Sequence, residues 1–380
     1  MERSQKKYDF IDTLRGLAIL GVILLHTSQI VQPSGWLLGQ IANNGQHGVQ
    51  LFYIASALTL FLSMHSRQQS ETAPTRNFFL RRFFRIAPMF YAALAVFFLL
   101  DGMSARYWAP YGLRWWYPVS TLLFLHGWYP ETIDSVVPGG WSIAVEMTFY
   151  LLLPLLFIYL RDIKSTLLYI AITLILGWEL NLLMTWVYTP LYPADQQYLV
   201  TSFVYFWFFN QAPIFGLGIL VYHLFVRARK IRGRAVGPAL LWGSLAWLAA
   251  IMATNLGDPL IQHHFLMSIG FAGLALGLYF THPRALVNPV TVWIGKLSYS
   301  LYLVHFGMLR VLGAVFPNGF PLQGDLGTAA AFLLVLGCST LVSYATYRLI
   351  ERPGIHLGAA LVDRLEQSRL QPHPHASQAD

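Results

Sequence analysis

The stretch Asp12-Thr-Leu-Arg15-Gly-Leu-Ala-Ile-Leu-Gly-Val-Ile-Leu-Leu-His26 decides the fold, because it is an apolar run with an arginine near its start and a histidine at its end. The run extends from Phe10 to about Val31, which is long enough for a helix to cross a bilayer. At 100° per residue, Arg15 and His26 return to nearly the same helix face, about 16 Å apart along the axis. Ionisable side chains inside a membrane are costly, so both are candidate functional residues.

The composition is that of a polytopic membrane protein. Of the 380 residues, 56% are hydrophobic and 11% are charged, and the mean hydropathy is +0.51, whereas soluble domains are about 25% charged. The net charge of +8 would suggest nucleic acid as a partner for a soluble protein, but here the cations lie at the ends of apolar segments, and we expect no nucleic acid. The single cysteine, Cys338, lies in an apolar segment, so neither a disulfide framework nor a cysteine metal site is expected.

The hydropathy pattern predicts an all-α polytopic integral membrane helix bundle with about ten transmembrane helices. Their approximate ranges are 10–31, 48–64, 84–101, 141–160, 166–188, 200–226, 238–254, 260–280, 292–316 and 326–349. Of the 25 lysines and arginines, all except Arg106, Arg114 and Arg310 fall on the side that would hold both termini. The positive-inside rule therefore predicts cytoplasmic termini and a multi-pass protein of the inner (plasma) membrane.

Residues 1–353 are expected to form the transmembrane domain, and residues 354–380 a cytoplasmic, disordered tail. The basic stretch Met1–Lys7 could imitate the start of a signal peptide, but no small-x-small cleavage site follows the apolar run, so we expect the first helix to be retained. The long outer segment 101–140 is rich in tryptophan, which fits either a platform for sugar rings or an interfacial aromatic belt.

The fourth span contains an acid, Glu146, with Ser142 and Tyr150 one turn to either side on its face. Counting residues from the ends of the two spans places Glu146 and His26 at similar depth, so we expect them to meet. A carboxylate beside an imidazole would fix its tautomer and raise its basicity, which suits His26 to take a proton from an alcohol. The alternative is a neutral structural histidine, with Glu146 tying helices together.

The ninth span carries a polar stripe of Ser298, Tyr302 and His305 at positions i, i+4 and i+7. Hydrogen bonds between helices would explain Ser298 and Tyr302 equally well. A second deep histidine is harder to explain in this way, so His305 is a secondary catalytic or acceptor-orienting candidate.

Two arginines at the start of the third span, Arg82 and Arg85, lie one turn apart. Together with Arg15 they would form an anion site suited to phosphates. The alternative is ordinary positive-inside anchoring, which also accounts for the basic residues between 227 and 234.

Six segments together carry a resemblance to a known family. They are Arg15 with ten residues to His26, including Asp12 and Gly16; the stretch 48–56; Arg82-x-x-Arg85-Ile-x-Pro88; Trp141-Ser142-x-x-x-Glu146-x-x-Phe149-Tyr150, followed by Pro154; Ser298-Tyr299, Tyr302 and His305; and Glu351-x-Pro353. This set resembles the acyltransferase-3 family of integral membrane acyltransferases, which includes bacterial surface-polysaccharide O-acetyltransferases. One departure is Ala57, where the family usually has a glycine, and we expect it to tighten that helix contact.

The resemblance implies that the chain uses cytoplasmic acyl-CoA, expected to be acetyl-CoA, as co-substrate, and a hydroxyl of a glycan or lipid-linked saccharide as acceptor. It places His26 at the centre of the chemistry. We hypothesise that Arg15, Arg82 and Arg85 hold the phosphates of CoA while its arm presents the thioester near His26 and Glu146. His26 would then deprotonate the acceptor or carry the acyl group. The supporting residues are Asp12, Ser142, Tyr150, Ser298 and Tyr302.

Two other functions stay open on the sequence alone. Deep histidine, glutamate and arginine residues also build proton relays, so a proton-coupled transporter is the rival class, although no inverted repeat of the kind found in many transporters is evident. The acceptor could also be a lipid or a small-molecule alcohol. We expect no fused esterase-like domain after the tenth span, so a protein that completes the transfer would be a separate chain. The sequence does not specify an oligomeric state.

Overall fold

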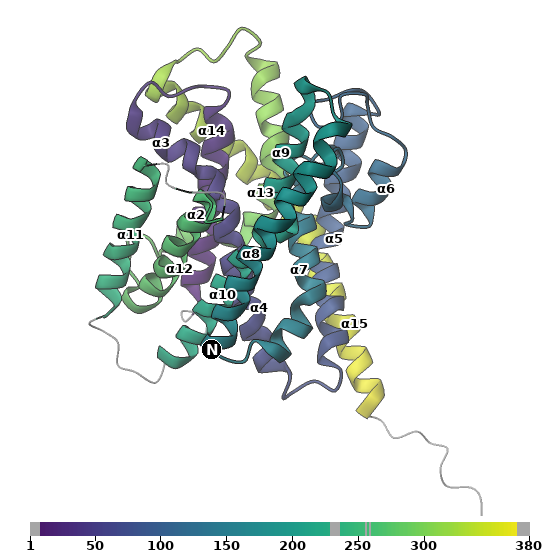
Figure 1. The fold of residues 1–380 in the computed structure, drawn as a ribbon, viewed down its shortest axis with the longest axis vertical. Helices are drawn as coiled ribbons and strands as arrows, with labels where there is room; N and C mark the ends of the chain where they lie inside the picture. The colour runs from purple at the N-terminus through teal and green to yellow at the C-terminus, as the bar shows by residue number, and fades with distance from the viewer. Residues whose placement is uncertain (1–7, 229–235, 255–256, 258–259, 371–380) are drawn as a thin grey trace, which may run out of the picture.

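The computed structural model describes residues 8–228, 236–254, 257 and 260–370, and within these ranges the chain is helical and has no strand (Figure 1). The helices are α2 (Asp9–Ser28), α3 (Trp36–Asn44), α4 (Gly48–Arg67), α5 (Pro74–Asp101), α6 (Trp116–Leu122), α7 (Gly140–Tyr159), α8 (Ile163–Tyr188), α9 (Gln197–Phe206), α10 (Phe208–Ala228), α11 (Val236–Thr254), α12 (His263–Thr281), α13 (Pro289–Val315), α14 (Gly324–Thr346) and α15 (Arg352–Leu370).

The predicted membrane bundle is confirmed, because ten helical stretches of the described chain are long and apolar enough to cross a bilayer. With ten crossings, α2 begins and α15 ends at the same end of the bundle. We call this the basic end, since the connections 67–74, 160–162 and 282–288 lie there with most of the lysines and arginines. The long segment 102–139 lies at the opposite end, and its apolar stretch forms the short helix α6.

The sixth span is broken into α9 and α10 at Trp207, whose backbone is extended. The break leaves the carbonyl oxygen of Tyr205 without its usual helical partner. The side-chain amides of Asn210 and Gln211 donate to this oxygen at 2.9 Å and 2.7 Å. Such compensation makes a broken helix tolerable at membrane depth, where no bulk water can hydrogen-bond the backbone.

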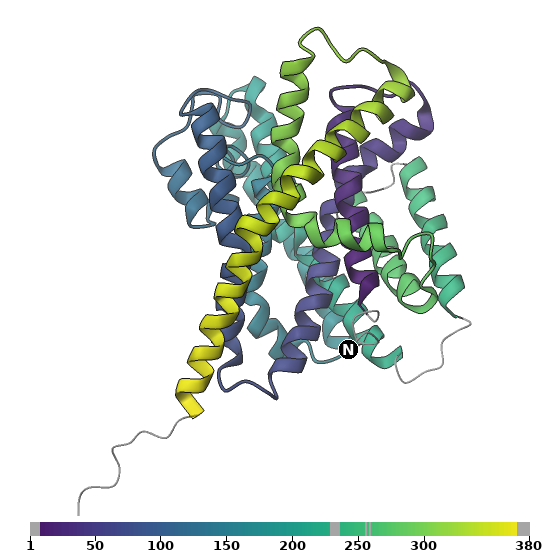
Figure 2. The same ribbon diagram turned by 180° about the vertical axis from the view of Figure 1, so that it is seen from behind.

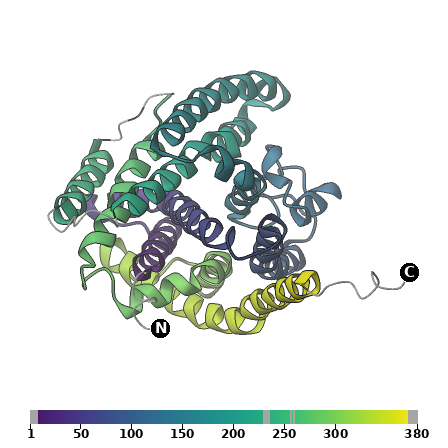
Figure 3. The same cartoon turned by 90° about the horizontal axis from the view of Figure 1, so that it is seen from below.

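Helix α2 lies toward the middle of the bundle and is packed closely by its neighbours (Figure 3). A Cβ atom at Gly295 of α13 would overlap the backbone of Asp12, and one at Gly48 of α4 would overlap the carbonyl of Ala18. Glycine at these positions therefore lets α4 and α13 approach the first helix to backbone contact. The side chains of Arg15 and His26 consequently face an enclosed interior.

The helix contact of Ala57 is with α10. Its methyl group packs on Gly218 of α10, where a Cβ atom would lie only 2.7 Å from the Cβ of Ala57.

Residues 354–370 differ from our expectation of a disordered tail, because they form most of α15. Gly354 and Gly358 lie against Phe84 of α5, and Figure 2 shows α15 running beside α5 to the basic end. The π-helical turn Tyr347–Glu351 connects α14 to this helix, and its buried acid fixes the turn to α13, since Glu351 Oε2 accepts a hydrogen bond from Ser300 at 2.7 Å. Packing on α5 therefore holds this segment as a helix, and residues 371–380 of the expected tail lie outside the described residues.

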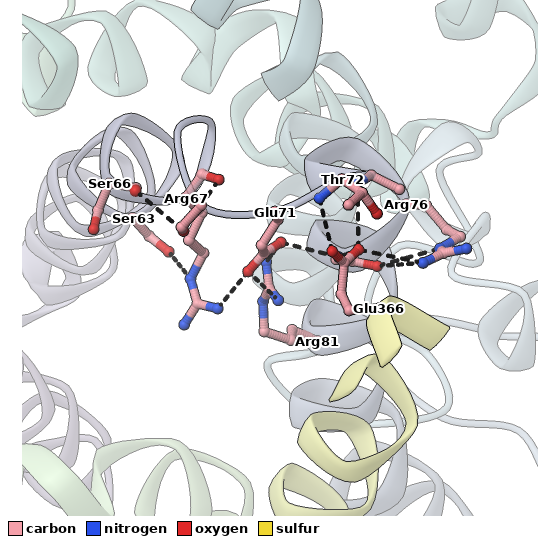
Figure 4. Close-up of polar contacts among 11 residues, drawn as sticks. Ser63, Ser66, Arg67, Glu71, Thr72, Arg76, Arg81 and Glu366 are labelled. Atoms are coloured by element: carbon pink, nitrogen blue, oxygen red, sulfur yellow. Dashed lines mark hydrogen bonds and ion pairs between the residues drawn. The ribbon is translucent and has the colours of Figure 1, made fainter. Parts of the chain in front are cut away.

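The far end of α15 is anchored by Glu366 (Figure 4). Its carboxylate accepts the backbone N–H of Thr72 at 2.7 Å and of Ala73 at 3.3 Å, and the side-chain amide of Asn77 at 2.7 Å. These donors surround the start of α5, where the first N–H groups have no helical acceptor. Glu366 therefore ties the last helix to the helix that carries Arg82 and Arg85.

Candidate active site

His26 lies on the wall of a cavity of about 690 Å³ toward the opposite end of the bundle, which we call the outer cavity. Its Nδ1 is 3.0 Å from Oε1 of Gln29, and its ring centre is 4.7 Å from that of Phe306. A carbonyl oxygen can only accept, so Nδ1 carries the proton and Nε2 keeps its lone pair. His26 is thereby held in the tautomer that a general base needs.

Glu146 does not lie beside His26, and that expectation is wrong. It lines a second, narrow cavity of about 80 Å³, which we call the inner cavity. Its Oε1 accepts hydrogen bonds from Ser56 at 2.5 Å and from Tyr150 at 2.6 Å. Counting residues placed both on the right helices, but the side chain of His26 on α2 and that of Glu146 on α7 face different cavities.

The three arginines of the predicted anion site all line the inner cavity with Glu146. Arg15 donates to Asp12 at 3.2 Å and to Thr59 at 3.0 Å. Arg82 is held differently, because its Nε is buried and finds no acceptor among the described residues. A buried donor of this kind is costly unless a ligand satisfies it, and an anionic oxygen is the acceptor that a guanidinium prefers.

Tyr302 separates the two cavities, and together with Val49 it lines both of them. Its hydroxyl lies 2.9 Å from Ser142 Oγ and donates to the carbonyl of Gly139 at 2.9 Å. The predicted residues Ser142 and Tyr302 therefore form one hydrogen-bonded group at the start of α7. Ser298 faces the inner cavity.

His305 lies behind His26 and lines neither cavity. It is fully buried, its Nδ1 is 3.2 Å from the carbonyl of Leu301, and its ring centre is 5.4 Å from that of His26. The predicted residue His305 is therefore in ring contact with His26 and does not reach the lining of either cavity.

The outer cavity brings aromatic rings and polar side chains together. Its rings belong to Tyr107, Trp108, Trp141, Tyr205, Phe206 and Phe306, and its polar groups to Gln29, Gln46, Gln50, Asp101, Arg106, Asp134 and Arg310. Of the tryptophans in the outer segment, Trp108 faces this cavity, whereas Trp115 and Trp128 are exposed. The outer tryptophans therefore divide into one that lines the cavity and others that lie at the surface.

Asp134 is a cavity residue that the sequence analysis did not select. It faces the outer cavity but is otherwise enclosed by protein, and this burial raises its pKa well above the usual range, against opposing hydrogen bonds from the backbone of Trp141, Gly139 and Gly140. Its neutral form is favoured and can donate a hydrogen bond to a ligand. In the sequence, Asp134 could have been selected because it is one of few acidic residues in the outer segment.

An ion pair at the same cavity was also missed. Arg310 of α13 binds both carboxylate oxygens of Asp101 at the end of α5, at 2.6 Å and 2.7 Å. Arg106 lies 3.7 Å from the same carboxylate and donates to the carbonyls of Gly102 and Ser135. Asp101 and Arg106 lie five residues apart, but no sequence spacing connects them to Arg310, which is more than two hundred residues away.

Residues 8–348 match the family described as acyltransferase domain, Acyl_transf_3. The chain belongs to the acyltransferase-3 family. This confirms the predicted family and the prediction that the chain is an acyltransferase. The match covers Arg15, His26, Arg82, Arg85, Glu146 and His305, whereas Glu351 lies beyond its end.

Relatives of this acyltransferase-3 family member carry names that describe O-acetylation. The peptidoglycan O-acetyltransferase OatA of Listeria monocytogenes is 24% identical over 92% of this chain and 56% of its own length. The O-acetyltransferase OatA of Staphylococcus aureus is 26% identical over 90% of this chain and 56% of its own length. The chain thus spans just over half the length of these relatives, and no solved structure matches it significantly.

Proposed function

We propose that this acyltransferase moves an acetyl group from cytoplasmic acetyl-CoA to a hydroxyl of a cell-surface glycan or lipid-linked saccharide. The observation that carries the proposal is the position of His26, whose side chain lines the outer cavity while an arginine-lined inner cavity begins on the other side of Tyr302. The names of the relatives support a glycan as acceptor.

The proposed orientation places the basic end in the cytoplasm and the outer cavity toward the cell surface. The distribution of lysine and arginine supports it, because positively charged loops are retained on the cytoplasmic side. Both termini would then be cytoplasmic, in the plasma membrane.

The donor would be held by the inner cavity and its arginines. Three arginines, Arg15, Arg82 and Arg85, line the inner cavity together with one acid, Glu146, so the charged groups of its lining are mostly positive. The unsatisfied Nε of Arg82 gives a phosphate oxygen a place to bind. Because the inner cavity is narrow, it suits the thin arm of the donor, with the thioester directed toward Tyr302.

The acceptor would occupy the outer cavity. Its volume of about 690 Å³ is within the roughly 300–1,000 Å³ of small-molecule sites. Trp141 and Phe206 stack with ring centres 4.3 Å apart and form an apolar wall. A wall of rings combined with amides and carboxyl groups can contact both the faces and the hydroxyls of a sugar.

The reaction breaks the thioester C–S bond and forms an ester C–O bond. In the direct route, Nε2 of His26 takes the proton of the acceptor hydroxyl as it attacks and returns it to the departing thiolate. In the covalent route, Nε2 attacks the thioester carbonyl and expels the CoA thiolate, and the acceptor hydroxyl then replaces Nε2 on the acyl carbon while its proton goes to the thiolate. Gln29 holds the required tautomer in both, and Glu146 balances the charge of the arginines rather than orienting His26.

The test uses full-length protein in liposomes, with acetyl-CoA supplied on the basic side and a saccharide acceptor on the other. We expect thiol release coupled to acetylated saccharide, loss of both in His26→Ala with CoA binding retained, and weaker CoA binding in Arg82→Ala. His356→Ala and Arg284→Gln change exposed residues outside both cavities and serve as controls.

Three outcomes would overturn parts of the proposal. Wild-type turnover in His26→Ala would remove this residue from the chemistry. If thiol is released only when a lipid or a small alcohol is present, and not with a saccharide, the acceptor is that lipid or alcohol instead of a glycan. No thiol release with any acceptor, combined with proton-coupled solute uptake, would favour a transporter.

A further inference from the structure

A third cavity, of about 860 Å³, lies at the basic end and shares no lining residue with the inner or outer cavity. We call it the basal cavity. It is enclosed by the end of α4, the connection from α7 to α8, and the last turns of α10. Nothing in the proposed transfer reaction uses it.

Cations line the rim of the basal cavity. Arg161 and Lys164 come from the α7–α8 connection, and Arg227 comes from the end of α10. All three are exposed, and none has a carboxylate partner among the described residues. The one acid in the lining, Asp162, accepts hydrogen bonds from the backbone N–H of Ser165 at 2.8 Å and from its hydroxyl at 2.9 Å, and so caps α8.

Several other arginines at the basic end pair with acids, whereas Arg161, Lys164 and Arg227 do not within the described part of the chain. Arg67 and Arg81 each lie 2.9 Å from Glu71, and Arg76 lies 3.6 Å from Glu366 (Figure 4). Positive-inside anchoring alone requires only that cations lie on one side of the membrane. It does not explain why three unpaired cations from two segments surround one cavity.

The floor of the basal cavity is aromatic. The ring of Phe61 lies 5.3 Å from that of Phe157 and 5.4 Å from that of Tyr222, measured between centres. An apolar floor beneath a cationic rim matches a ligand with a phosphate group joined to an apolar or ring-shaped part.

We propose that the basal cavity binds a phosphate group, carried by either an anionic phospholipid or the nucleotide end of a coenzyme A ester. The two sources share the chemistry that the cavity offers, which is two guanidinium groups and one ammonium group around an aromatic floor. The inference does not rest on acetyl transfer, since phosphate binding can be measured without turnover.

The experiment compares full-length wild type with Arg161→Gln/Lys164→Gln, and with Arg284→Gln/Arg364→Gln as a control that removes two exposed cations elsewhere at the same end. Native mass spectrometry measures phosphatidylglycerol retained from mixed phosphatidylglycerol–phosphatidylcholine nanodiscs. Calorimetry in pure phosphatidylcholine nanodiscs measures the affinity for adenosine 3′,5′-bisphosphate. We expect the Arg161→Gln/Lys164→Gln variant to bind either phosphatidylglycerol or the bisphosphate at least about tenfold more weakly than wild type. The reason is that each basic side chain near an anionic headgroup increases the binding constant by about a factor of five.

If the cavity variant loses only phosphatidylglycerol binding, the basal cavity is a lipid site. If it loses only bisphosphate binding, the cavity holds the nucleotide end of a coenzyme A ester. Loss of both would show one phosphate site for which they compete. Equal binding in the cavity and control variants would overturn the proposal. Arg227→Gln provides a second variant from another helix, and Arg161→Lys/Lys164→Arg, which keeps both charges, should bind like wild type. Loss of transfer in His26→Ala would leave phosphatidylglycerol retention unchanged, so the two proposals fail separately.

Discussion

Oε1 of Gln29 lies 3.0 Å from Nδ1 of His26, so a residue outside every motif quoted from the sequence sets the tautomer of the candidate base. Hydrogen bonds to the second ring nitrogen commonly fix which nitrogen carries the proton. The pair belongs to one helix end, where α2 has just finished and the chain turns.

Replacing Gln29 by leucine should lower kcat by about tenfold, the smaller end of the effect of removing a partner that orients a histidine. Donor affinity should not change, because Gln29 does not line the inner cavity. Gln29→Glu keeps an acceptor oxygen and should retain most of the turnover. Gln32→Leu, at a nearby exposed position, is the control, and an unchanged kcat in Gln29→Leu would contradict the assigned tautomer.

Glu146→Gln should tighten CoA binding severalfold while turnover falls. The amide keeps an oxygen for Ser56 and Tyr150, but the inner cavity loses its negative charge beside three arginines. Titration of CoA into nanodisc-embedded protein measures the affinity, with Glu179→Gln on the exposed face of α8 as control. If acceptor affinity changes and donor affinity does not, Glu146 belongs to the acceptor site.

Asp101 and Arg310 should be energetically coupled by about 1 kcal/mol, the upper part of the range for exposed ion pairs. Their bidentate geometry favours coupling, whereas the 44% exposure of the Arg310 side chain lets water screen it. Thermal unfolding of Asp101→Asn, Arg310→Gln and the double variant gives the coupling by a double-mutant cycle. Additive effects would mean that the pair contributes no net stability.

His126 should make the outer segment sensitive to acid. Burial lowers its pKa from 6.5 to about 4, against the opposing hydrogen bond to the carbonyl of Gly140. On acidification, His126 therefore takes up a proton at a higher pH in the unfolded chain than in the folded one. The stability that the neutral, buried ring provides is complete above about pH 6.5. As the pH falls toward 4, the free energy of unfolding should decrease by about 3 kcal/mol in total.

The measurement is the melting temperature of wild type and His126→Gln across this pH window. The difference between them should change with pH, because glutamine does not titrate. His356→Gln removes an exposed histidine and should follow wild type throughout. Parallel curves for wild type and His126→Gln would show that His126 is not buried as a neutral ring.

Glu366→Ala should release the end of α15 from α5, since three donors around residues 72–77 lose their acceptor. Limited proteolysis should then cleave α15 several times faster than in wild type. Asp363→Ala changes an exposed acid on the same helix and should not alter the rate. Equal cleavage rates would show that Gly354 and Gly358 packing alone holds the helix.

The number, order and approximate bounds of the spans were predictable from apolar runs, because a bilayer demands about 20 apolar residues for each crossing whatever the tertiary contacts. The grouping of Arg15, Arg82 and Arg85 was also predictable, since their positions near the basic ends of two spans place them at one depth. The extent of α15 was not predictable, because its order depends on contacts with α5 that local sequence does not encode.

The sequence by itself determined that this is a ten-span membrane bundle and which ionisable residues lie inside it, because burial in lipid depends on composition along the chain. Only the tertiary structure decided which cavity each side chain faces. The side chain of Glu146 faces the inner cavity and not His26, while Asp134 and the Asp101–Arg310 pair line the outer cavity with His26 from distant segments. The physical reason is that residue spacing specifies depth and face on one helix, whereas the rotation and neighbours of each helix follow from close packing at glycines such as Gly48 and Gly295.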